Sequence, residues 1–205
     1  MKFPATFDLE KQLWEKGLNL IAGIDEVGRG AWAGPVVAAA VVFPQFFAPS
    51  FRLYDSKLLG AKEREDLATK IWQSAFVGIG IIGVPTINKS GIGKATQKAF
   101  RQAAFSLQVS PEHYLIDAFY ISYWNRAIQT PIKSGDKICA SIAAASVVAK
   151  VYRDDLMRGL AQKYPAYGLH FHKGYGTKAH QRAIARHKLS RIHRRSFNLA
   201  PYLNG

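Results

Sequence analysis

Cysteine is almost absent from this 205-residue sequence, which contains only Cys139. A single thiol excludes an internal disulfide and a thiolate metal cage, and it fits a reducing compartment. Acidic residues are also scarce: there are 14, against 28 lysines and arginines, which leaves a formal net charge of +14. A surplus of this size attracts polyanions, and nucleic acid is the commonest such partner. The composition therefore favours nucleic-acid binding over a merely solvated surface or an anchor to anionic lipid.

Long hydrophobic runs are missing as well. The longest nearly uncharged stretches, 31–43 and 138–149, are shorter than the roughly 18 to 20 residues that cross a bilayer. The first residues lead into Asp8 and Glu10 instead of an apolar run with a small-residue cleavage site, so we expect no secretion signal. We accordingly expect a cytoplasmic protein with no membrane partner. Its 48% of apolar residues can build a full hydrophobic core.

Repeats, low-complexity tracts and flexible linkers are absent too, so we predict a single domain over residues 1–205. Hydrophobic periodicity predicts a three-strand meander, then helices, a further strand and more helices. The expected strands are 20–25, 36–42, 76–84 and 113–117, and the expected helices are 61–73, 91–107, 141–162 and 178–187, the last capped by Thr177. This order indicates an α/β fold, a mixed sheet flanked by helices.

Basic residues concentrate toward the C-terminal end. From Lys150 onward the chain has twelve lysines and arginines, two acidic residues and five of the six histidines. We expect a phosphate-facing surface here, with residues from about 164 forming a basic substrate-binding loop and a helical tail. In the helix 141–162, a face of small residues would pack on the sheet while Lys150, Arg153 and Arg158 point outward.

Asp25 is unusual in so basic a chain, because it closes an apolar strand and precedes Glu26 and a glycine-containing turn, Gly28-Arg29-Gly30. A carboxylate there is costly to bury unless it is paired, protonated or bound to a cation. Strand side chains alternate between faces, so both acids can share one site only if the chain leaves extended geometry at Glu26. Gly28 and Gly30 lack Cβ atoms and let backbone groups approach a ligand. A surface turn is the alternative.

Asp117 repeats this pattern at the end of the strand 113–117. Acids at the carboxyl ends of neighbouring strands converge, and Asp136, just before the long helix, can reach the same point. Carboxylates that share a pocket repel one another and are stable mainly with a hard dication, which predicts Mg²⁺ or Mn²⁺. Two such ions about 3.5 to 4 Å apart can activate water and stabilise the leaving oxygen of a phosphodiester.

Other catalytic motifs are missing. The sequence has no Gly-x-Ser-x-Gly elbow and no Gly-x-x-x-x-Gly-Lys-Ser/Thr phosphate loop, and Cys139 has no base beside it. His170, His172 and His180 lack thiolate neighbours and the i, i+4 spacing of helical zinc ligands, so we expect them to touch phosphate or pack locally. A metal-dependent nuclease is favoured, with a non-enzymatic duplex-binding protein as the alternative.

The motifs closely resemble those of bacterial ribonuclease HII. The resemblance covers roughly residues 20–197, and six blocks follow that family's order. These are Asp25-Glu26-Val27-Gly28-Arg29-Gly30 with Ala33-Gly34-Pro35-Val36-Val37; Asp55-Ser56-Lys57-Leu58; Leu115-Ile116-Asp117-Ala118; Ser141-Ile142-Ala143-Ala144-Ala145-Ser146 through Ala149-Lys150-Val151 to Arg153-Asp154; His172-Lys173-Gly174-Tyr175-Gly176-Thr177; and His193-Arg194-Arg195-Ser196-Phe197.

The resemblance implies a ribonuclease H-like fold and a monomeric endonuclease that uses water as nucleophile. Such enzymes cut 5′ of ribonucleotides in RNA–DNA hybrids or within duplex DNA, leaving 3′-hydroxyl and 5′-phosphate ends. A general ribonuclease H-like DNA nuclease is the enzymatic alternative. The resemblance implies that two metal ions are bound during catalysis, and it assigns as their ligands Asp25, Glu26, Asp117 and Asp136. The residues that it assigns to substrate binding are Gly28, Arg29, Gly30, Lys57, Lys150 and Tyr175.

Two of these assignments, those of the Gly28-Arg29-Gly30 turn and of Tyr175, also have a basis in the chemistry of the side chains and backbone. Backbone groups of Gly28-Arg29-Gly30 can reach the ribose 2′-hydroxyl, the group that separates RNA from DNA. Tyr175 resembles the aromatic residue that packs on the neighbouring deoxyribose, and packing on His172 is its alternative role. One departure affects Asp136: the family usually has lysine before the Gly-Asp pair, where this chain has Ser134. Lys133 or Lys137 can substitute, and Asp154 is the second candidate for the fourth acid.

Overall fold

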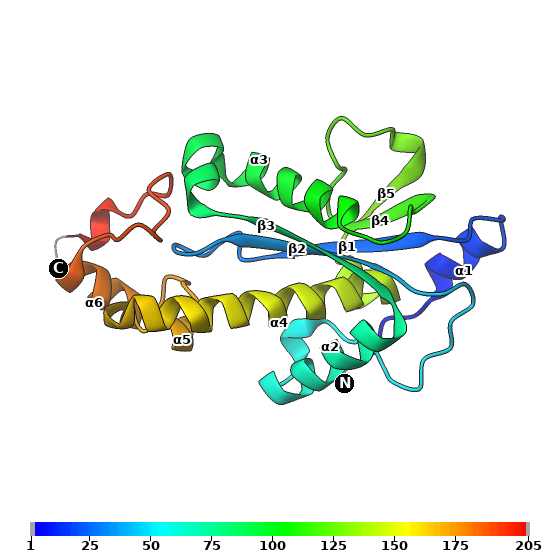
Figure 1. Ribbon diagram of the computed structural model, residues 1–205, viewed down its shortest axis with the longest axis horizontal. Helices are drawn as coiled ribbons and strands as arrows, with labels where there is room; N and C mark the ends of the chain where they lie inside the picture. The colour runs from blue at the N-terminus through cyan, green and yellow to red at the C-terminus, as the bar shows by residue number, and fades with distance from the viewer. Residues whose placement is uncertain (1–2, 204–205) are drawn as a thin grey trace.

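The computed structural model describes residues 3–203 and shows a five-stranded sheet with helices on both faces (Figure 1). The strands lie in the order β3-β2-β1-β4-β5. The first three form an antiparallel meander, and β4 and β5 run parallel to β1. The predicted α/β class, a mixed sheet flanked by helices, is confirmed. The strands are β1 (Ile21–Val27), β2 (Val36–Val42), β3 (Phe76–Ile82), β4 (His113–Asp117) and β5 (Gln129–Ile132).

Helices approach the sheet closely from both sides. α4 (Ala140–Lys163) and α2 (Ala61–Ser74) lie on one face, and α3 (Val84–Phe105) covers the other (Figure 1). A Cβ atom on Gly23 of β1 would lie only 2.2 Å from the carbonyl carbon of Ser141 in α4. Glycine is therefore required at this position for α4 to pack against the strand that ends in Asp25.

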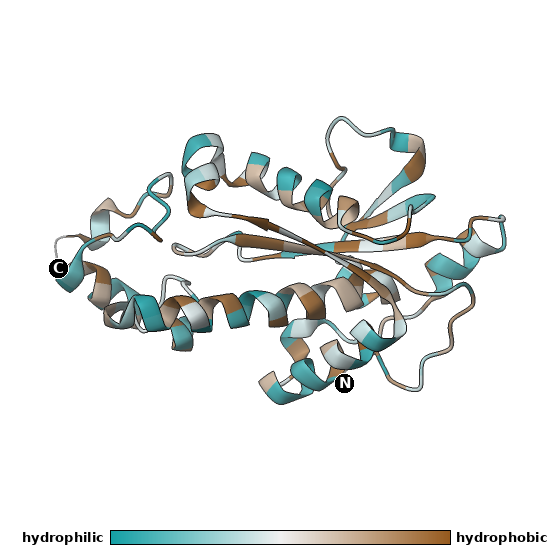
Figure 2. Cartoon of the chain, viewed as in Figure 1, coloured by the Kyte–Doolittle hydropathy of each residue, from teal (hydrophilic) through white to brown (hydrophobic). Residues whose placement is uncertain are grey.

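β2 is buried along its whole length, and its sequence Val-Val-Ala-Ala-Ala-Val-Val is apolar throughout. A strand covered on both faces needs apolar side chains at every position instead of alternation. Figure 2 shows the resulting hydrophobic band in the centre of the sheet. The buried side chains form one apolar cluster on each face. This two-sided core holds the ends of β1 and β4, and hence their terminal acids, in fixed positions.

Most predicted elements are present, with differences at their ends. β2, β4 and the terminal helix α6 (Lys178–His187) have the predicted bounds, and Thr177 caps α6 by accepting a hydrogen bond from the His180 N–H. α3 begins at Val84 instead of 91, because Gly91, with φ of 77°, only kinks the helix. The elements that the periodicity missed are short: α1 (Asp8–Trp14), β5, α5 (Leu169–His172), and the 3₁₀ turns η1 (Ser56–Leu58), η2 (Arg126–Ile128), η3 (Gly135–Lys137), η4 (Pro165–Tyr167) and η5 (Ala200–Tyr202).

The expected departure from extended geometry at Glu26 is wrong. β1 continues to Val27, which pairs with Val37 of β2, and the strand conformation ends only at Gly28, where φ is 91°. On its other side β1 pairs with β4 no further than Ile24. The last residues of β1 therefore project beyond β4, so acids on opposite faces of the strand can border one opening.

The outward orientation expected for Arg153 is also wrong. Lys150 and Arg158 keep part of their side chains exposed, but Arg153 is fully buried. Its guanidinium donates to the carbonyl oxygens of Pro35, at 3.0 Å, and Ala33, at 3.3 Å. These backbone acceptors compensate the burial, and hydropathy patterning along α4 carries no information about them.

The C-terminal elements α5, α6 and η5 pack around the end of α4 that is remote from α1 (Figure 1). Here the hydrophobic cluster is small and joins Met157 and Ala161 of α4 to Tyr167, Leu169 and Ile192. None of the helices within residues 3–203 combines the length and the apolar character that a bilayer crossing requires.

Candidate active site

The ends of β1 and β4 bring Asp25 and Asp117 together. Ile24 and Ile116 are paired across the two parallel strands, and each acid is the next residue of its strand. The turn η3 reaches the same end of the sheet, because the Gly135 N–H donates to Asp117 Oδ1 at 2.8 Å. This contact brings Asp136 to the acids of β1 and β4, as the sequence predicted for acids at neighbouring strand ends.

A cleft of about 230 Å³ opens at this point. Six of the residues singled out from the sequence line it, and the turn Gly28-Arg29-Gly30 follows directly at its edge. The lining residues are Asp25, Glu26, Val27, Ser56, Lys57, Arg64, Asp117, Ser146, Lys150 and Tyr175. Asp136 is not among the lining residues, but its carboxylate accepts a hydrogen bond from Lys57 Nζ at 3.0 Å.

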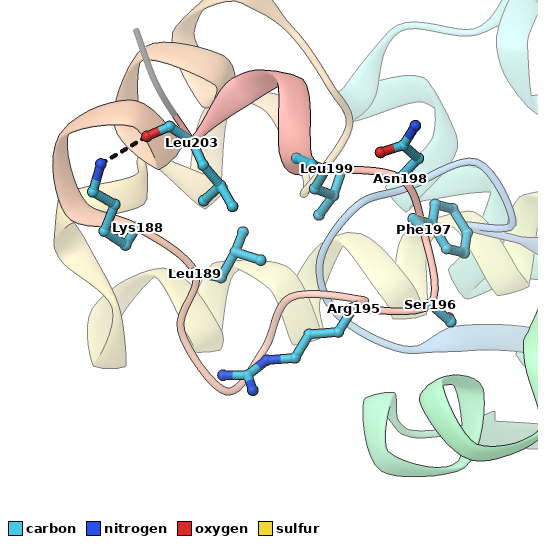
Figure 3. A pocket seen from close by; sticks show the side chains of 9 residues that line it. Lys188, Leu189, Arg195, Ser196, Phe197, Asn198, Leu199 and Leu203 are labelled. Atoms are coloured by element: carbon cyan, nitrogen blue, oxygen red, sulfur yellow. Dashed lines mark hydrogen bonds between the residues drawn. The ribbon is translucent and has the colours of Figure 1, made fainter.

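A larger hollow of about 880 Å³ lies at the C-terminal end of the molecule (Figure 3). Figure 3 shows its side chains, which are a mixture of leucines and Phe197 with the charged Lys188 and Arg195 and the polar Ser196 and Asn198. Its lining contains no aspartate or glutamate among residues 3–203. Size alone therefore does not identify the site of chemistry, and the smaller cleft with its acids is the better candidate.

Burial and mutual repulsion raise the pKa values of three acids in the cleft. The pKa of Asp25 lies well above its ordinary value, mainly because the side chain is buried and then because Glu26 and Asp117 are close. Burial also raises the pKa of Glu26, although the Arg29 guanidinium opposes this shift. Burial and the nearby Asp136 raise the pKa of Asp117. These acids are therefore incompletely neutralised by the protein's own cations.

The available cations each neutralise part of the cluster. Lys57 pairs with Asp136 at 3.0 Å and with Asp55 at 3.9 Å, and Arg29 pairs with Glu26 Oε1 at 3.3 Å. The second oxygen of Glu26, Oε2, is buried without a partner in residues 3–203. Lys57 is the lysine that pairs with Asp136, and the substitution of Lys133 or Lys137 for the family's lysine stays a prediction.

The donor set fits a hard divalent cation. Residues 3–203 contain no group of three or more acids, histidines or cysteines already arranged around a metal position. The buried Glu26 oxygen, which has no partner among residues 3–203, and the raised pKa of Asp25 show that the cluster is short of positive charge. Oxygen ligands of this kind suit Mg²⁺ or Mn²⁺.

The two candidates for the fourth acid have different surroundings. Asp136 is buried and shares Lys57 with Asp55. Asp154 pairs with Lys150 at 2.6 Å, one helical turn away. Arg153, the neighbour of Asp154 in the sequence, is not its ion-pair partner, because the Arg153 guanidinium is buried and binds the Ala33 and Pro35 carbonyls. Lys150 makes the direct ion pair with Asp154 instead.

The turn after β1 is held against the interior. A Cβ atom on Gly28 would lie 2.2 Å from Nε of Arg153, so only glycine fits there, whereas a Cβ on Gly30 would meet nothing within 4 Å. The Arg29 guanidinium lies 4.7 Å from the centre of the Phe119 ring. One glycine thus allows close packing, and the other leaves open space beside the cleft.

Tyr175 joins the cleft to the C-terminal region. Its ring borders the cleft and lies 5.4 Å from the Arg153 guanidinium, a cation–π arrangement. Its N–H donates to the His172 carbonyl at 3.0 Å, and its own carbonyl is 3.0 Å from His180 Nδ1. The ring therefore packs on Arg153, while backbone contacts connect the residue to the histidines.

Three histidines form a buried chain behind Tyr175. Because the Tyr175 carbonyl only accepts, His180 Nδ1 carries the proton, and its Nε2 accepts from His193 Nε2 at 3.2 Å. His193 Nδ1 in turn accepts from the Ser190 N–H at 3.0 Å. His172 stacks on His180 at 4.4 Å between ring centres. These rings pack locally, one of the two outcomes expected, and only His170 of the predicted three is exposed.

Sequence reasoning missed three polar residues of the cleft, Ser56, Arg64 and Ser146. Ser146 acts against the raised pKa of Asp25 and lies 3.0 Å from the Ser56 hydroxyl. Arg64 donates to the Ser56 carbonyl at 2.9 Å and also to the Leu59 carbonyl, which braces the turn that carries Lys57. Ser146 lies within a block that resembles the family and was detectable there, but nothing in the sequence distinguished Arg64 from other surface arginines.

The mixed sheet flanked by helices, with acids at the ends of β1 and β4, defines a ribonuclease H-like fold. Among solved structures, ribonuclease H2 from Pyrococcus horikoshii is similar, with a TM-score of 0.74, 20% identity and coverage of 91% of this chain and all of that one. Bst-RNase HIII in complex with Mn²⁺ gives a TM-score of 0.70 at 19% identity, covering 90% of this chain and 68% of that one.

Sequence comparison is more specific. The ribonuclease HII family profile matches residues 22–200. Ribonuclease HII from Pediococcus pentosaceus is 46% identical over 203 residues, which cover 97% of this chain and 77% of that protein. The protein of the same name from Herpetosiphon aurantiacus is 44% identical, with 92% and 93% covered. The chain belongs to the ribonuclease HII family, and it is a ribonuclease H hydrolase.

Proposed function

We propose that this ribonuclease H cuts the phosphodiester on the 5′ side of ribonucleotides, in RNA–DNA hybrids or embedded in duplex DNA. The products would carry 3′-hydroxyl and 5′-phosphate ends. The observation that carries the proposal is one cleft bordered by the acids of β1 and β4, by two lysines and by Tyr175, with the Gly28-Arg29-Gly30 turn at its edge. An acidic centre beside cationic side chains suits hydrolysis of a polyanion.

Activity would depend on Mg²⁺ or Mn²⁺, with two ions during catalysis. Asp25, Glu26, Asp117 and Asp136 would hold the ions, and the Mn²⁺ in the Bst-RNase HIII structure is consistent with such a site in this fold. When bound, the ions supply a water of lowered pKa and charge stabilisation at the leaving 3′ oxygen. The Gly135 N–H, which donates to Asp117, orients that carboxylate toward the cleft.

Substrate recognition would use the edge of the cleft. The open space in front of Gly30 admits a ribose, whose 2′-hydroxyl can meet backbone groups of the turn. Tyr175 would pack on the neighbouring deoxyribose and so favour a junction from RNA to DNA. Lys57, with a side chain 76% exposed, and Lys150 would contact phosphates that position the duplex without reading its sequence.

The whole chain would act as one catalytic domain and as a monomer. Residues from about 164 onward would form its basic substrate-binding loop and tail. Exposed arginines of α6, such as Arg182 and Arg186, support this role because their charges face solvent. Arg153 and Arg194, which are buried, do not contribute to that surface.

The test is cleavage of two duplexes that differ only in one embedded ribonucleotide, with Mg²⁺ or Mn²⁺ present. We expect one cut, 5′ of the ribonucleotide, and no cleavage of the all-DNA duplex. Cleavage of both would favour a general nuclease of this fold. Salt-sensitive binding without cleavage of either would favour a non-enzymatic binder. Analysis of the product ends would check the predicted 3′-hydroxyl and 5′-phosphate.

A further inference from the structure

The C-terminal segment contains two adjacent arginines in opposite environments. Arg194 is fully buried, whereas Arg195 is exposed and lines the C-terminal hollow (Figure 3). Both would count equally toward a basic tail that binds phosphate. A buried guanidinium cannot reach a phosphate on a duplex outside the protein, so Arg194 requires another explanation.

Arg194 binds the segment that contains the Gly28-Arg29-Gly30 turn. Its Nη1 donates to the Arg29 carbonyl at 2.9 Å, and its Nε donates to the Gly34 carbonyl at 3.0 Å. Its backbone N–H also donates to the Trp32 carbonyl at 2.7 Å. One residue of the tail therefore fixes three carbonyls between positions 29 and 34, about 160 residues earlier in the chain.

The contact with Arg29 fixes how the turn presents its backbone. The Arg29 carbonyl and the Gly30 N–H belong to the same trans peptide unit and point in opposite directions. Because the carbonyl is drawn inward by Arg194, the Gly30 N–H points away from the interior. A Cβ on Gly30 would meet nothing within 4 Å, so open space lies beside this peptide unit.

Stability alone does not account for a guanidinium in this position. Arg194 has no carboxylate within ion-pair distance among residues 3–203, and its Nη2 is buried without a partner. Burial and then the like charge of Arg153 lower the pKa of Arg194 to about 9, which still leaves the group protonated at neutral pH. A buried, unpaired cation is costly. Its forked geometry can satisfy two carbonyls at once, which a lysine cannot do.

We propose that Arg194 is a positioning residue for substrate reading: it holds the Gly28-Arg29-Gly30 turn so that the backbone faces the ribose, and it does not contact phosphate. Arg153 assists from the other side by binding the Ala33 and Pro35 carbonyls. The inference rests on the ribose-reading role proposed above for the turn. It separates the two neighbouring arginines by function, although they have the same charge.

The test compares Arg194→Gln with Arg195→Gln, a matched control that removes the same charge one residue further along. Affinity is measured without divalent cation for two duplexes that differ only in one ribonucleotide. Arg194→Gln should lose at least fivefold of the wild-type preference for the ribonucleotide duplex, with its salt dependence unchanged. Arg195→Gln should keep the preference and bind both duplexes more weakly, with a smaller salt slope. The reverse pattern would overturn the proposal.

Amide NMR shifts of Gly28 and Gly30 give a second readout that is independent of substrate. Unchanged shifts in Arg194→Gln would refute its effect on the turn. Changed shifts with an intact ribose preference would refute the reading role of the turn, and with it both this inference and that part of the proposed function. If the wild type itself shows no ribose preference, the proposed function fails, while the shifts still decide whether Arg194 sets the turn.

Folding must be controlled for, because Arg194 is buried. Arg194→Lys keeps the charge but can satisfy only one of the two carbonyls, so it should lose part of the preference. A merely structural role would lower the melting temperature and the affinity for both duplexes in proportion. It would leave the ratio of the two affinities unchanged, and that result in Arg194→Lys would count against the proposal even if Arg194→Gln did not fold.

Discussion

The acidic cleft and the buried basic cluster behind Tyr175 differ in the partners that their buried polar groups have. In the cleft, carboxylates from β1, β4 and η3 raise one another's pKa values, and one Glu26 oxygen has no partner among the described residues. In the basic cluster, defined as Arg153, His172, His180, His193 and Arg194, backbone carbonyls accept hydrogen bonds from four of the five side chains, and one nitrogen of each arginine is buried without a partner among the described residues. The carboxylates of the cleft therefore lack part of the positive charge that would balance them. The arginines of the basic cluster instead bind backbone carbonyls of the segment 29–35, which follows β1.

This contrast shows that the sequence gives the sign of a charged residue but does not reveal whether its side chain faces solvent or the interior. Three of the scarce acids, Asp25, Glu26 and Asp117, line one cleft, as the ends of two apolar strands predicted for Asp25 and Asp117. The plentiful basic residues divided into two sets, an exposed one on α6 and a buried one that contacts the chain itself. The first set is accessible from solvent, and the second is not.

The largest expected effect comes from removing one charge of the cleft. Asp25→Asn should reduce the rate at saturating metal and substrate by about a thousandfold or more, because a neutral amide holds a dication poorly. Duplex affinity should remain nearly unchanged. Single-turnover cleavage and binding in the same buffer measure both, and Asp8→Asn, an exposed acid, is the control. A normal rate in Asp25→Asn would refute the proposed site.

The next effect is a pH dependence of stability that distinguishes the two regions. Burial lowers the pKa of His180 and of His193 to about 4. Between about pH 6.5 and 4 the unfolded chain therefore binds protons that the folded chain does not, so stability falls as the pH falls, by at most about 3 kcal/mol for each histidine. Because the two rings share a hydrogen bond, the loss for the pair should be less than twice this value.

Acids of the cleft act with the opposite sign. The pKa values of Asp25 and Asp117 are raised on folding, so their protonation favours the folded state as the pH falls. Urea unfolding at pH 7 and pH 5 should show a smaller loss of stability for His193→Gln than for the wild type. His170→Gln, which changes an exposed histidine, should behave as the wild type. Equal slopes in all three proteins would contradict the assignment to the buried pair.

A smaller effect is expected at Tyr175, where the two regions meet. Tyr175→Ala should reduce the preference for an RNA-to-DNA junction by about tenfold, roughly the worth of one aromatic packing contact. Its effect on overall duplex affinity should be smaller. Tyr123→Ala removes a fully exposed tyrosine and provides the control. Equal losses on a continuous hybrid and on a single-ribonucleotide duplex would contradict the junction role.

The sequence predicted the features that depend on neighbouring residues, and it did not predict those that depend on contacts between residues far apart in the chain. β2, β4 and α6 were predicted to the residue because their apolar patterns and the Thr177 cap are local. Asp25 and Asp117 were predicted to meet because both end apolar strands. The burial of Arg153 and Arg194 was not predictable, since the carbonyls that bind them lie 118 to 165 residues away in the chain.

The access of both Asp25 and Glu26 to the cleft also depends on a contact between distant parts of the chain, the pairing of β1 with β4. Alternation of side chains along a strand predicted that Asp25 and Glu26 could share a site only if the strand ended between them, yet β1 continues to Val27. What lets both reach the cleft is the shorter pairing with β4, which stops at Ile24. Register between distant strands is a tertiary property, and the resemblance to a family supplied the shared site where periodicity alone did not.

The smallest expected effect concerns the exposed part of the tail. Arg186→Gln on α6 should weaken duplex binding about two- to threefold and reduce the slope of log K against log salt by about 0.9, the value for one phosphate contact. The rate at saturating substrate should not change, because the side chain lies outside the cleft lining. Lys62→Gln, which changes an exposed lysine of α2, is the matched control. An unchanged salt slope in Arg186→Gln would mean that this face of α6 does not contact the duplex. It would contradict the proposed role of the basic tail in substrate binding.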